Sequence, residues 1–523
     1  MIRMFCNSQR NEYDIRPLIM SFFPGETLEY EVKDLSACEN IADIIEELEK
    51  NIHSGEVVTG EDTVILGAFC DGVIWCKLIE KDGRQTWESQ ILNENITDKF
   101  YRDTLKRFIY RVLKEGLKRT VKWGTLTGVR PSKVPMKYLL EGLDEKSTVS
   151  KLMDEYYMSE EKAHLSTTVA KNELAVLENT GYETGYSVYI GIPFCPTVCN
   201  YCSFSSISLA KLKDGEKLML DYLAALKKEC QAVKEMMQGK RMTSLYVGGG
   251  TPTALNEEGL RLLMDMIREN FDVDGSCEFT VEAGRPDSIN EEKLRILKDA
   301  RVTRISVNPQ TMKDDTLKIM GRNHTVCQVK EAFHMARRMG FDNINMDLIA
   351  GLMDESVFDF ENTMNEIMAL GPDSFTVHSL VVKRASRYRN EQEKNKHEGA
   401  TDQIADDKGF SNDTVEDMLS IAEKCAGDNS YEPYYMYRQK NKAGLGCNSV
   451  LENVGYSKKG KEGLYNILIM EEMQSIIALG AGASSKLLFG DRIERVANVK
   501  NVYEYISRID EMIERKRRGL NDE

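Results

Sequence analysis

Three of the twelve cysteines lie close together in the chain, as Cys195, Cys199 and Cys202. Cysteines placed at random would give this spacing about 0.006 times in such a chain, so the pattern is specific. Thiolates on one short loop can hold three corners of a 4Fe–4S cubane, which needs a fourth ligand to be closed. The next cysteine, Cys230, lies in a helical stretch. The pattern therefore predicts a cluster with one iron open to an outside ligand.

A zinc ion is the alternative occupant of this loop. Structural zinc sites also use four ligands, drawn mainly from cysteine and histidine. The sequence has no histidine between residues 165 and 323. The ligand set therefore favours the iron–sulfur cluster, and zinc remains open as a second interpretation.

The cysteine loop follows the first of six short apolar stretches that alternate with stretches of helical period. Strands are predicted at Val188–Ile190, Ser244–Val247, Glu278–Val281, Thr303–Val307, Asn345–Ile349 and Ser374–Leu380. Helices between them are predicted at Gly259–Glu269, Glu291–Ala300, Val326–Met339 and Val357–Leu370. Six βα units in a row predict a parallel sheet, either open and doubly wound or closed into a complete or partial barrel. In all of these folds, ligands bind at the carboxyl ends of the strands.

The rest of the chain is less informative. Residues 1–180 are predicted to form an α+β domain of unknown role, with a β-hairpin around Asp71-Gly72 and an apolar helical stripe from Leu105 to Leu117. The strand–helix series is assigned to a core at 181–385. A polar insertion is predicted at 386–412, followed by a C-terminal region at 413–523 that covers the substrate.

Composition narrows the class of protein. The 523 residues include 41% hydrophobic residues, which is ordinary for a globular chain, and suffice for two or three domains. The net charge of −15 argues against general binding to nucleic acid or to anionic membranes. No apolar run approaches the ~18 residues of a membrane span, and the first residues lack the order of a signal peptide. We expect a cytoplasmic protein without membrane or nucleic-acid partners.

Motifs at successive strand ends extend the pattern beyond the cysteines. They are Gly248-Gly-Gly-Thr-Pro-Thr253, Glu282, Asn308-Pro-Gln310, Gly321-Arg322 and Asn345-Met-Asp347-Leu-Ile-Ala-Gly351. Together with the cysteine loop, this run resembles the radical S-adenosylmethionine (SAM) superfamily, and within it the oxygen-independent coproporphyrinogen III dehydrogenase family. The N-terminal part, with Trp123–Ser132, resembles the HemZ-like branch. The resemblance implies an α/β fold, the incomplete (β/α)6 barrel of radical SAM enzymes, with a 4Fe–4S cluster and SAM as cofactors.

The resemblance also implies roles for single residues. The cysteines would hold the cluster, and the glycines at 248–250 would let backbone groups approach the amino-acid end of SAM. Carboxylates at strand ends accept hydrogen bonds from ribose hydroxyls or an ammonium, and Gln and Arg donate them. The candidate SAM-binding residues are Tyr189, Gly249, Gly250, Thr251, Glu282, Gln310, Arg322, Asp347 and Val381. His378, near the end of the sixth strand, is a candidate proton donor or a core histidine.

The implied reaction is the oxidative decarboxylation of coproporphyrinogen III propionates to vinyl groups in haem biosynthesis, through a 5′-deoxyadenosyl radical. It requires a low-potential one-electron donor such as flavodoxin or ferredoxin. Cationic anchors for the propionates would come from Arg384, Arg387, Arg438 or Lys440. In contrast to many decarboxylating relatives, the chain has Phe204 in place of a fourth cysteine and Gly191 in place of a histidine.

Two other functions remain open. A haem carrier could use the same barrel, but the His-Asn-x-x-Tyr-Trp signature of the carriers is absent, and Arg438-Gln-Lys-Asn441 is present instead. A radical SAM enzyme with an unrelated substrate is the other alternative. Release of both 5′-deoxyadenosine and carbon dioxide from coproporphyrinogen III would support decarboxylation. Release of 5′-deoxyadenosine without carbon dioxide would reject it.

Overall fold

The computed structural model describes residues 1–36, 38, 40–53, 62–70, 72–92, 97–202, 206–380, 412–438, 451–490 and 492–521. Val381 and nearly all of the predicted polar insertion lie outside these residues. The chain divides into two units, Met1–Thr168 with Arg438–Leu451, and Val169–Tyr437 with Glu452–Glu523. The predicted strand–helix series therefore lies wholly in the second unit.

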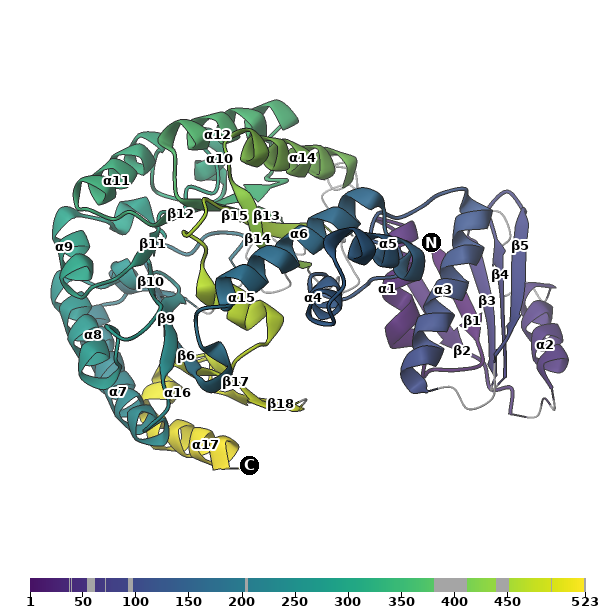
Figure 1. Ribbon diagram of the computed structural model, residues 1–523, viewed down its shortest axis with the longest axis horizontal. Coiled ribbons are helices and arrows are strands. Elements are labelled where there is room, and N and C mark those ends of the chain that lie inside the picture. The colour runs from purple at the N-terminus through teal and green to yellow at the C-terminus, as the bar shows by residue number, and fades with distance from the viewer. Residues whose placement is uncertain are drawn as a thin grey trace. The chain divides into compact units, whose positions relative to one another are not determined.

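In the first unit, the described strands form one sheet in the order β2-β1-β3-β4-β5 (Figure 1). Their bounds are β1 (Ile2–Cys6), β2 (Leu28–Val32), β3 (Thr63–Cys70), β4 (Val73–Ile79) and β5 (Gln85–Ile91). β1 runs parallel to both neighbours, whereas β3, β4 and β5 are antiparallel, which confirms the expected hairpin. Helix α3 (Asp98–Leu117) buries Leu105, Phe108 and Leu113 of the predicted apolar stripe in the core of this unit. The other helices are α1 (Glu12–Phe22), α2 (Ile41–His53), α4 (Lys133–Leu140), α5 (Glu145–Tyr156) and α6 (Glu160–Leu177), which continues into the second unit.

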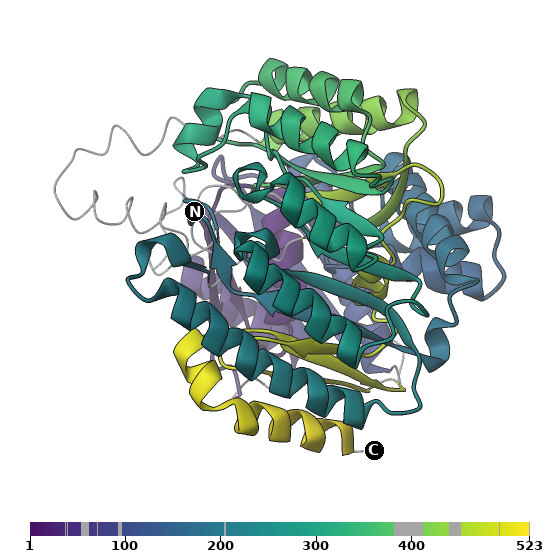
Figure 2. The same ribbon diagram turned by 90° about the vertical axis from the view of Figure 1, so that its left-hand side faces the viewer.

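The second unit is built on a curved sheet with helices along its outer face (Figures 1 and 2). The central strands are β6 (Tyr186–Ile192), β9 (Met242–Gly249), β10 (Glu278–Glu282), β11 (Arg304–Ser306), β12 (Ile344–Ala350) and β13 (Ser374–Ser379). All neighbouring pairs in this series are parallel. Most residues of these strands are buried, and they include polar and charged side chains such as Glu278, Arg304 and Asn345 as well as apolar ones. These strands with their crossover helices form the partial (β/α)6 barrel.

The outer helices follow the strands in chain order. They are α7 (Gly215–Met236), α8 (Glu257–Asn270), α9 (Glu291–Asp299), α10 (Asp314–Ile319), α11 (Val326–Arg338), α12 (Val357–Leu370) and α14 (Asn412–Asp428). Several begin at a side-chain cap: Asn256, Asn290 and Thr325 accept hydrogen bonds from backbone amides of the first turn. Two short strands, β7 (Phe194–Cys195) and β8 (Ile207–Ser208), pair outside the main sheet. None of the described helices is both long and apolar enough to cross a membrane.

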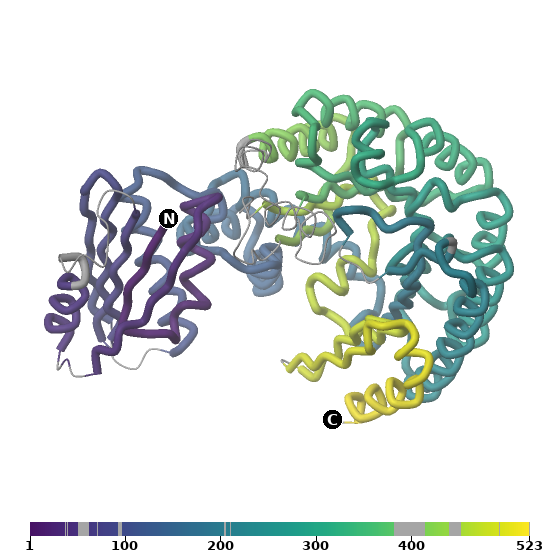
Figure 3. The backbone as a smooth tube through the Cα atoms, turned by 180° about the vertical axis from the view of Figure 1, so that it is seen from behind, coloured from purple at the N-terminus to yellow at the C-terminus, as the bar shows by residue number. Residues whose placement is uncertain are grey.

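The C-terminal elements extend the sheet at both edges. They are β14 (Glu432–Arg438), β15 (Glu452–Ser457), α15 (Leu464–Glu471), β16 (Ile476–Leu479), β17 (Ser484–Phe489), β18 (Arg492–Ala497), α16 (Val502–Ser507) and α17 (Ile509–Asn521). β15 pairs antiparallel with β13, whereas β16 lies parallel to β6. Figure 3 follows this return of the chain, in yellow, to the side of β6, and Figure 2 shows α17 along α7. The C-terminal strands therefore belong to the same sheet as the barrel strands.

Candidate functional site

The cysteine loop leaves the carboxyl end of β6 and is held in place by backbone hydrogen bonds. β7 pairs with β8, and the Asn200 amide donates to the Met320 carbonyl at 3.0 Å. The Cys202 amide donates to the Cys199 carbonyl at 3.1 Å, which closes a tight turn. Cys199 is buried, whereas Cys195 and Cys202 are partly exposed. The loop thus places three cysteine side chains, one buried and two partly exposed, at one end of the barrel.

The glycine motif after β9 lies directly against this loop. The Gly250 amide donates to the Ile192 carbonyl at 2.7 Å, and the Thr251 amide donates to the Phe194 carbonyl at 2.7 Å. A Cβ at Gly250 would lie 2.4 Å from the Phe194 oxygen and 3.0 Å from Cys195 Sγ. Only a residue without a side chain permits this approach, so the glycine motif and the cysteine loop form one structure.

This arrangement fits a three-cysteine cubane. The donors are all sulfur, and the backbone behind Cys195 has no side chain that would compete for space. Among the described residues, no three histidine, cysteine, aspartate or glutamate side chains gather closely enough to hold a single metal ion. A cubane makes a different demand, since each cysteine ligates a different iron.

Glu282, at the end of β10, contacts residues of the neighbouring strand β9. The Tyr246 hydroxyl donates to Glu282 Oε1 at 2.6 Å, and a Cβ at Gly248 would lie 2.9 Å from the same oxygen. Burial raises the pKa of Glu282 to about 7, with a smaller contribution from nearby Asp347. This carboxyl group therefore changes charge near neutral pH.

Three tyrosine rings stack beside Glu282. Tyr189 from β6 and Tyr246 from β9 have ring centroids 6.3 Å apart, and Tyr465 from α15 lies 4.6 Å from Tyr246. Burial raises the pKa of all three phenols, so the hydroxyls stay protonated. The stack gives the interior next to Glu282 an aromatic wall. Tyr465 was not predicted from the sequence, because it comes from an element almost 300 residues away from Tyr189.

Asp347, on β12, carries the second carboxylate of the site. Burial opposes its ionisation, but the nearby His378 side chain and the hydrogen bond from the Asn345 side chain outweigh burial and lower the pKa of Asp347. The side-chain Nδ2 of Asn345 donates to Asp347 Oδ1 at 2.8 Å, and His378 Nε2 lies 3.9 Å from the same oxygen. His378 Nδ1 lies 3.1 Å from the Tyr437 hydroxyl. The His378 side chain therefore contacts Tyr437 and lies near Asp347, and it remains 27% exposed.

Gln310 is held in an unusual backbone conformation. Its φ of 70° lies in the left-handed region, which costs a non-glycine residue about 1 kcal/mol or more. The Gln310 amide donates to the Asp347 carbonyl at 3.0 Å, and the Ile349 amide donates to the Gln310 carbonyl at 2.9 Å. These bonds to β12 fix the strained residue beside Asp347, and strain of this kind is common at functional sites.

Arg322 holds the backbone turn that precedes Gln310. Its Nη1 donates to the carbonyls of Asn308 at 2.6 Å and Pro309 at 3.1 Å, so one nitrogen holds the turn that leads to Gln310. Arg322 is buried, and within the described part of the chain its Nε has no hydrogen-bond partner. The guanidinium thus retains a donor beyond those that hold the turn.

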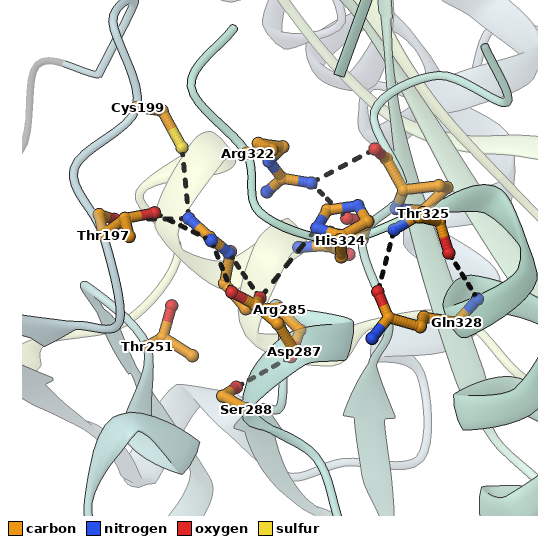
Figure 4. Close-up of polar contacts among 12 residues, drawn as sticks. Thr197, Cys199, Thr251, Arg285, Asp287, Ser288, Arg322, His324, Thr325 and Gln328 are labelled. Carbon is orange, nitrogen blue, oxygen red and sulfur yellow. Dashed lines mark hydrogen bonds and ion pairs between the residues drawn. The ribbon is translucent and has the colours of Figure 1, made fainter. Parts of the chain in front are cut away.

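Arg285 is a functional candidate that sequence reasoning missed. It follows Glu282 by three residues, and its guanidinium reaches the cysteine loop (Figure 4). Its Nη1 lies 3.4 Å from Cys199 Sγ, and its Nη2 donates to Thr197 Oγ1 at 2.9 Å. The sequence offered one indication of this role, since Arg285-Pro-Asp287 closely follows the strand-end Glu282. A single arginine, however, is usually a solvated surface residue.

The structure brings most of the predicted residues together in two groups. Cys195, Gly250 and Thr251 lie at the cysteine loop, where Thr251 Oγ1 is 3.8 Å from Cys195 Sγ. The carboxylates of Glu282 and Asp347 influence each other electrostatically inside the barrel. The other members of the second group are Tyr189, Gly248, Gln310 and His378.

The predicted propionate anchors are mostly outside the described residues, as are Val381 and Phe204. This applies to Arg384, Arg387 and Lys440. Arg438 is described and buried in the first unit, where its guanidinium stacks 4.9 Å from the Trp123 ring and donates to the Leu126 carbonyl. These contacts give Arg438 a structural role in that unit.

Comparison with known proteins gives the same classification. Residues 189–367 match the radical SAM superfamily. The oxygen-independent coproporphyrinogen-III oxidase-like protein HemZ of Bacillus subtilis (strain 168) is 38% identical over 443 residues, which is 83% of this chain and 84% of HemZ. The haem chaperone HemW of the same organism is 37% identical over 209 residues, which is 40% of this chain and 54% of HemW.

A solved structure shares the fold. The coproporphyrinogen III oxidase HemN of Escherichia coli, a radical SAM enzyme, superposes with a TM-score of 0.50 at 23% identity, over 65% of this chain and 73% of HemN. The superfamily uses a 4Fe–4S cluster and SAM, which agrees with the cysteine loop and the strand-end motifs. The chain therefore belongs to the radical SAM superfamily and, within it, to the oxygen-independent coproporphyrinogen III oxidase-like family that includes HemZ.

Proposed function

We propose that this chain catalyses the oxygen-independent oxidative decarboxylation of coproporphyrinogen III to protoporphyrinogen IX. The observation that carries the proposal is the similarity to HemZ over most of both chains. The fold shared with HemN supports the same reaction class. The tetrapyrrole substrate and the reaction are thus taken from the relatives, and the residues below are this chain's own.

In the proposed enzyme, the barrel residues hold the cofactors. Cys195, Cys199 and Cys202 would ligate the cluster, and Gly248–Gly250 would let backbone groups approach the amino-acid end of SAM. When bound, the cluster and SAM supply a 5′-deoxyadenosyl radical, which can remove a hydrogen atom from a substrate. Glu282 and Asp347 would accept hydrogen bonds from the ribose hydroxyls or the ammonium of SAM.

Other residues would orient SAM and keep water out. Tyr189 would pack beside the adenosine. Gln310, fixed against β12, and Arg322, which holds the turn before it, would supply hydrogen bonds to SAM. The stacked rings of Tyr189, Tyr246 and Tyr465 exclude water from one side of the interior, which protects a reactive radical from side reactions.

The proposed reaction balances for each propionate. One hydrogen atom leaves a side-chain carbon, the bond to the carboxyl carbon breaks, and carbon dioxide leaves. One electron passes to a one-electron acceptor, and a vinyl group remains. Reduction of the cluster for the next turnover takes an electron from a low-potential donor of the flavodoxin or ferredoxin type.

The test is turnover under anaerobic conditions. Reconstituted protein is mixed with coproporphyrinogen III, SAM and dithionite, and the products are analysed by chromatography and mass spectrometry. We expect 5′-deoxyadenosine, carbon dioxide and a divinyl product, and none of these from the Cys199→Ala variant. Release of 5′-deoxyadenosine without carbon dioxide would contradict the proposed reaction.

Haem binding is the second candidate function. The observation that favours it is the 37% identity to the haem chaperone HemW, which is confined to 54% of HemW. Titration of the purified protein with haem, followed by absorption spectroscopy and gel filtration, separates the two functions. Stoichiometric haem uptake without decarboxylation would favour a haem carrier.

A further inference from the structure

Arg285 is a buried cation beside a predicted cluster ligand. Its side chain is 3% exposed, and Nη1 lies 3.4 Å from Cys199 Sγ and 3.2 Å from the Thr197 carbonyl. We infer that Arg285 tunes the reduction potential of the cluster, by fixing a positive charge and an N–H donor at the sulfur of Cys199. The inference concerns the cluster and does not depend on which tetrapyrrole the protein uses.

The position of the guanidinium is determined by its other contacts. Asp287 binds it through both oxygens, with Nε donating to Oδ1 at 2.9 Å and Nη2 to Oδ2 at 2.7 Å. Nη2 also donates to Thr197 Oγ1 at 2.9 Å (Figure 4). Because the planar guanidinium is fixed on one edge by Asp287, its remaining donors point to the cysteine loop.

Burial of this charge requires compensation. Isolated charges are expensive to bury, whereas paired and hydrogen-bonded charges are tolerated. An arginine guanidinium stays protonated at physiological pH, and this one is paired with Asp287 and hydrogen-bonded to Thr197. Asp287 supplies one negative charge, and the thiolate ligands of a cluster supply the others.

Within the described residues, neither His324 nor Arg322 supplies a second cation at the sulfur of Cys199. Burial lowers the pKa of His324 to about 4, so this ring, 3.9 Å from Asp287, is neutral at physiological pH. The Nη1 of Arg322 is directed to the carbonyls of Asn308 and Pro309 instead. Arg285, with its partner Asp287, thus places a positive charge against Cys199.

A cation at this position favours the reduced cluster. Reduction adds one electron to a group whose thiolates are already negative, and a nearby positive charge stabilises the added charge. Hydrogen bonds to cluster sulfurs and local net charge are among the factors that set the potential of iron–sulfur clusters. Removing the positive charge should make the potential more negative, and removing the charge of Asp287 should make it more positive.

The test is a redox titration of reconstituted protein, without SAM or substrate, followed by EPR of the reduced cluster. At the midpoint potential of the unmodified protein, Arg285→Gln should lower the ratio of reduced to oxidised cluster about tenfold. For a one-electron couple this corresponds to about 59 mV. Arg285→Lys should retain most of the potential, and Asp287→Asn should shift it in the positive direction.

The control is Arg295→Gln on α9. Arg295 is exposed and pairs with Glu291 and Glu292, so its loss should leave the potential unchanged. Iron and sulfide content is measured for every variant. An unchanged potential in Arg285→Gln with full iron content overturns the inference. If that variant loses iron, an Asp287→Asn potential equal to or below that of the unmodified protein overturns it independently.

Discussion

The Tyr246 hydroxyl donates a 2.6 Å hydrogen bond to Glu282 Oε1 across two neighbouring strands of the barrel. Burial raises the pKa of Glu282 to about 7, and the bond from Tyr246 acts in the opposite direction, since it favours the carboxylate. The protein thus places a group that titrates near neutral pH at the end of β10, where SAM is proposed to bind.

We predict that SAM affinity depends on the charge of Glu282. The ionised carboxylate accepts hydrogen bonds at both oxygens, whereas the protonated form carries an O–H group on one of them. For a group with a pKa near 7, the ionised fraction rises about tenfold between pH 6 and 8, and the affinity for SAM should rise with it. Calorimetric titration of the reconstituted protein with SAM measures this. Glu282→Gln should bind SAM more weakly at pH 8 and should lose this pH dependence. Tyr246→Phe removes a bond that lowers the pKa and should move the transition to higher pH; a transition unchanged in both variants would contradict the assignment.

Each cysteine of the loop should be required for the cluster. Replacing Cys195, Cys199 or Cys202 by alanine removes one of three protein ligands, so iron and sulfide should fall to a small fraction of the unmodified level. Chemical iron and sulfide analysis, with EPR in the presence and absence of SAM, measures the loss. Cys327→Ser, at an exposed position on α11, is the matched control and should retain the cluster.

Gly250→Ala should disrupt the contact between the glycine motif and the cysteine loop. The new Cβ would lie 2.4 Å from the Phe194 carbonyl oxygen, so backbone must move. Such strain typically costs 1–3 kcal/mol, about as much as a core overpacking substitution. The measurement is cluster content together with the thermal unfolding midpoint. Gly427→Ala, in α14 with no atom within 4 Å of the new Cβ, should instead stabilise the helix by about 0.5–1 kcal/mol.

The buried ion pair between α17 and α7 should be important for stability. Lys516 and Glu229 are 1% and 0% exposed, with Nζ 2.7 Å from Oε1. Lys516→Met leaves the buried Glu229 carboxylate without its cationic partner, and removing one partner of a buried ion pair typically costs 3–5 kcal/mol. Urea unfolding measures this loss. Arg515→Gln, which removes a surface ion pair to Glu511, should cost less than about 1 kcal/mol. Equal losses in the two variants would argue against the buried pair as the cause.

The sequence was sufficient to predict the central architecture. Buried parallel strands are short apolar runs, and the runs at Val188–Ile190 and Asn345–Ile349 fall within β6 and β12. The cysteine loop could be recognised because its residue types are rare and closely spaced. The domain boundaries proposed at 180 and 412 remain proposals.

Contacts between distant residues could not be predicted in this way. The sequence of β16 does not indicate that this strand pairs in parallel with β6. Tyr465 and Tyr437 reach the barrel interior only through that long-range topology. Arg285 was missed for a different reason, since burial of an arginine depends on partners that the sequence does not place near it.

The parallel pairing of β6 with β16 has a consequence for how the protein is made. β6 directly precedes the cysteine loop, and a Cβ at Gly480, just after β16, would lie 2.4 Å from the Gly191 oxygen. During synthesis on the ribosome, β6 emerges long before Ile476–Leu479 and lacks this neighbour until that segment has been made. The loop that carries Cys195, Cys199 and Cys202 therefore acquires the support of β16 only after all the other barrel strands, up to β13, have been synthesised.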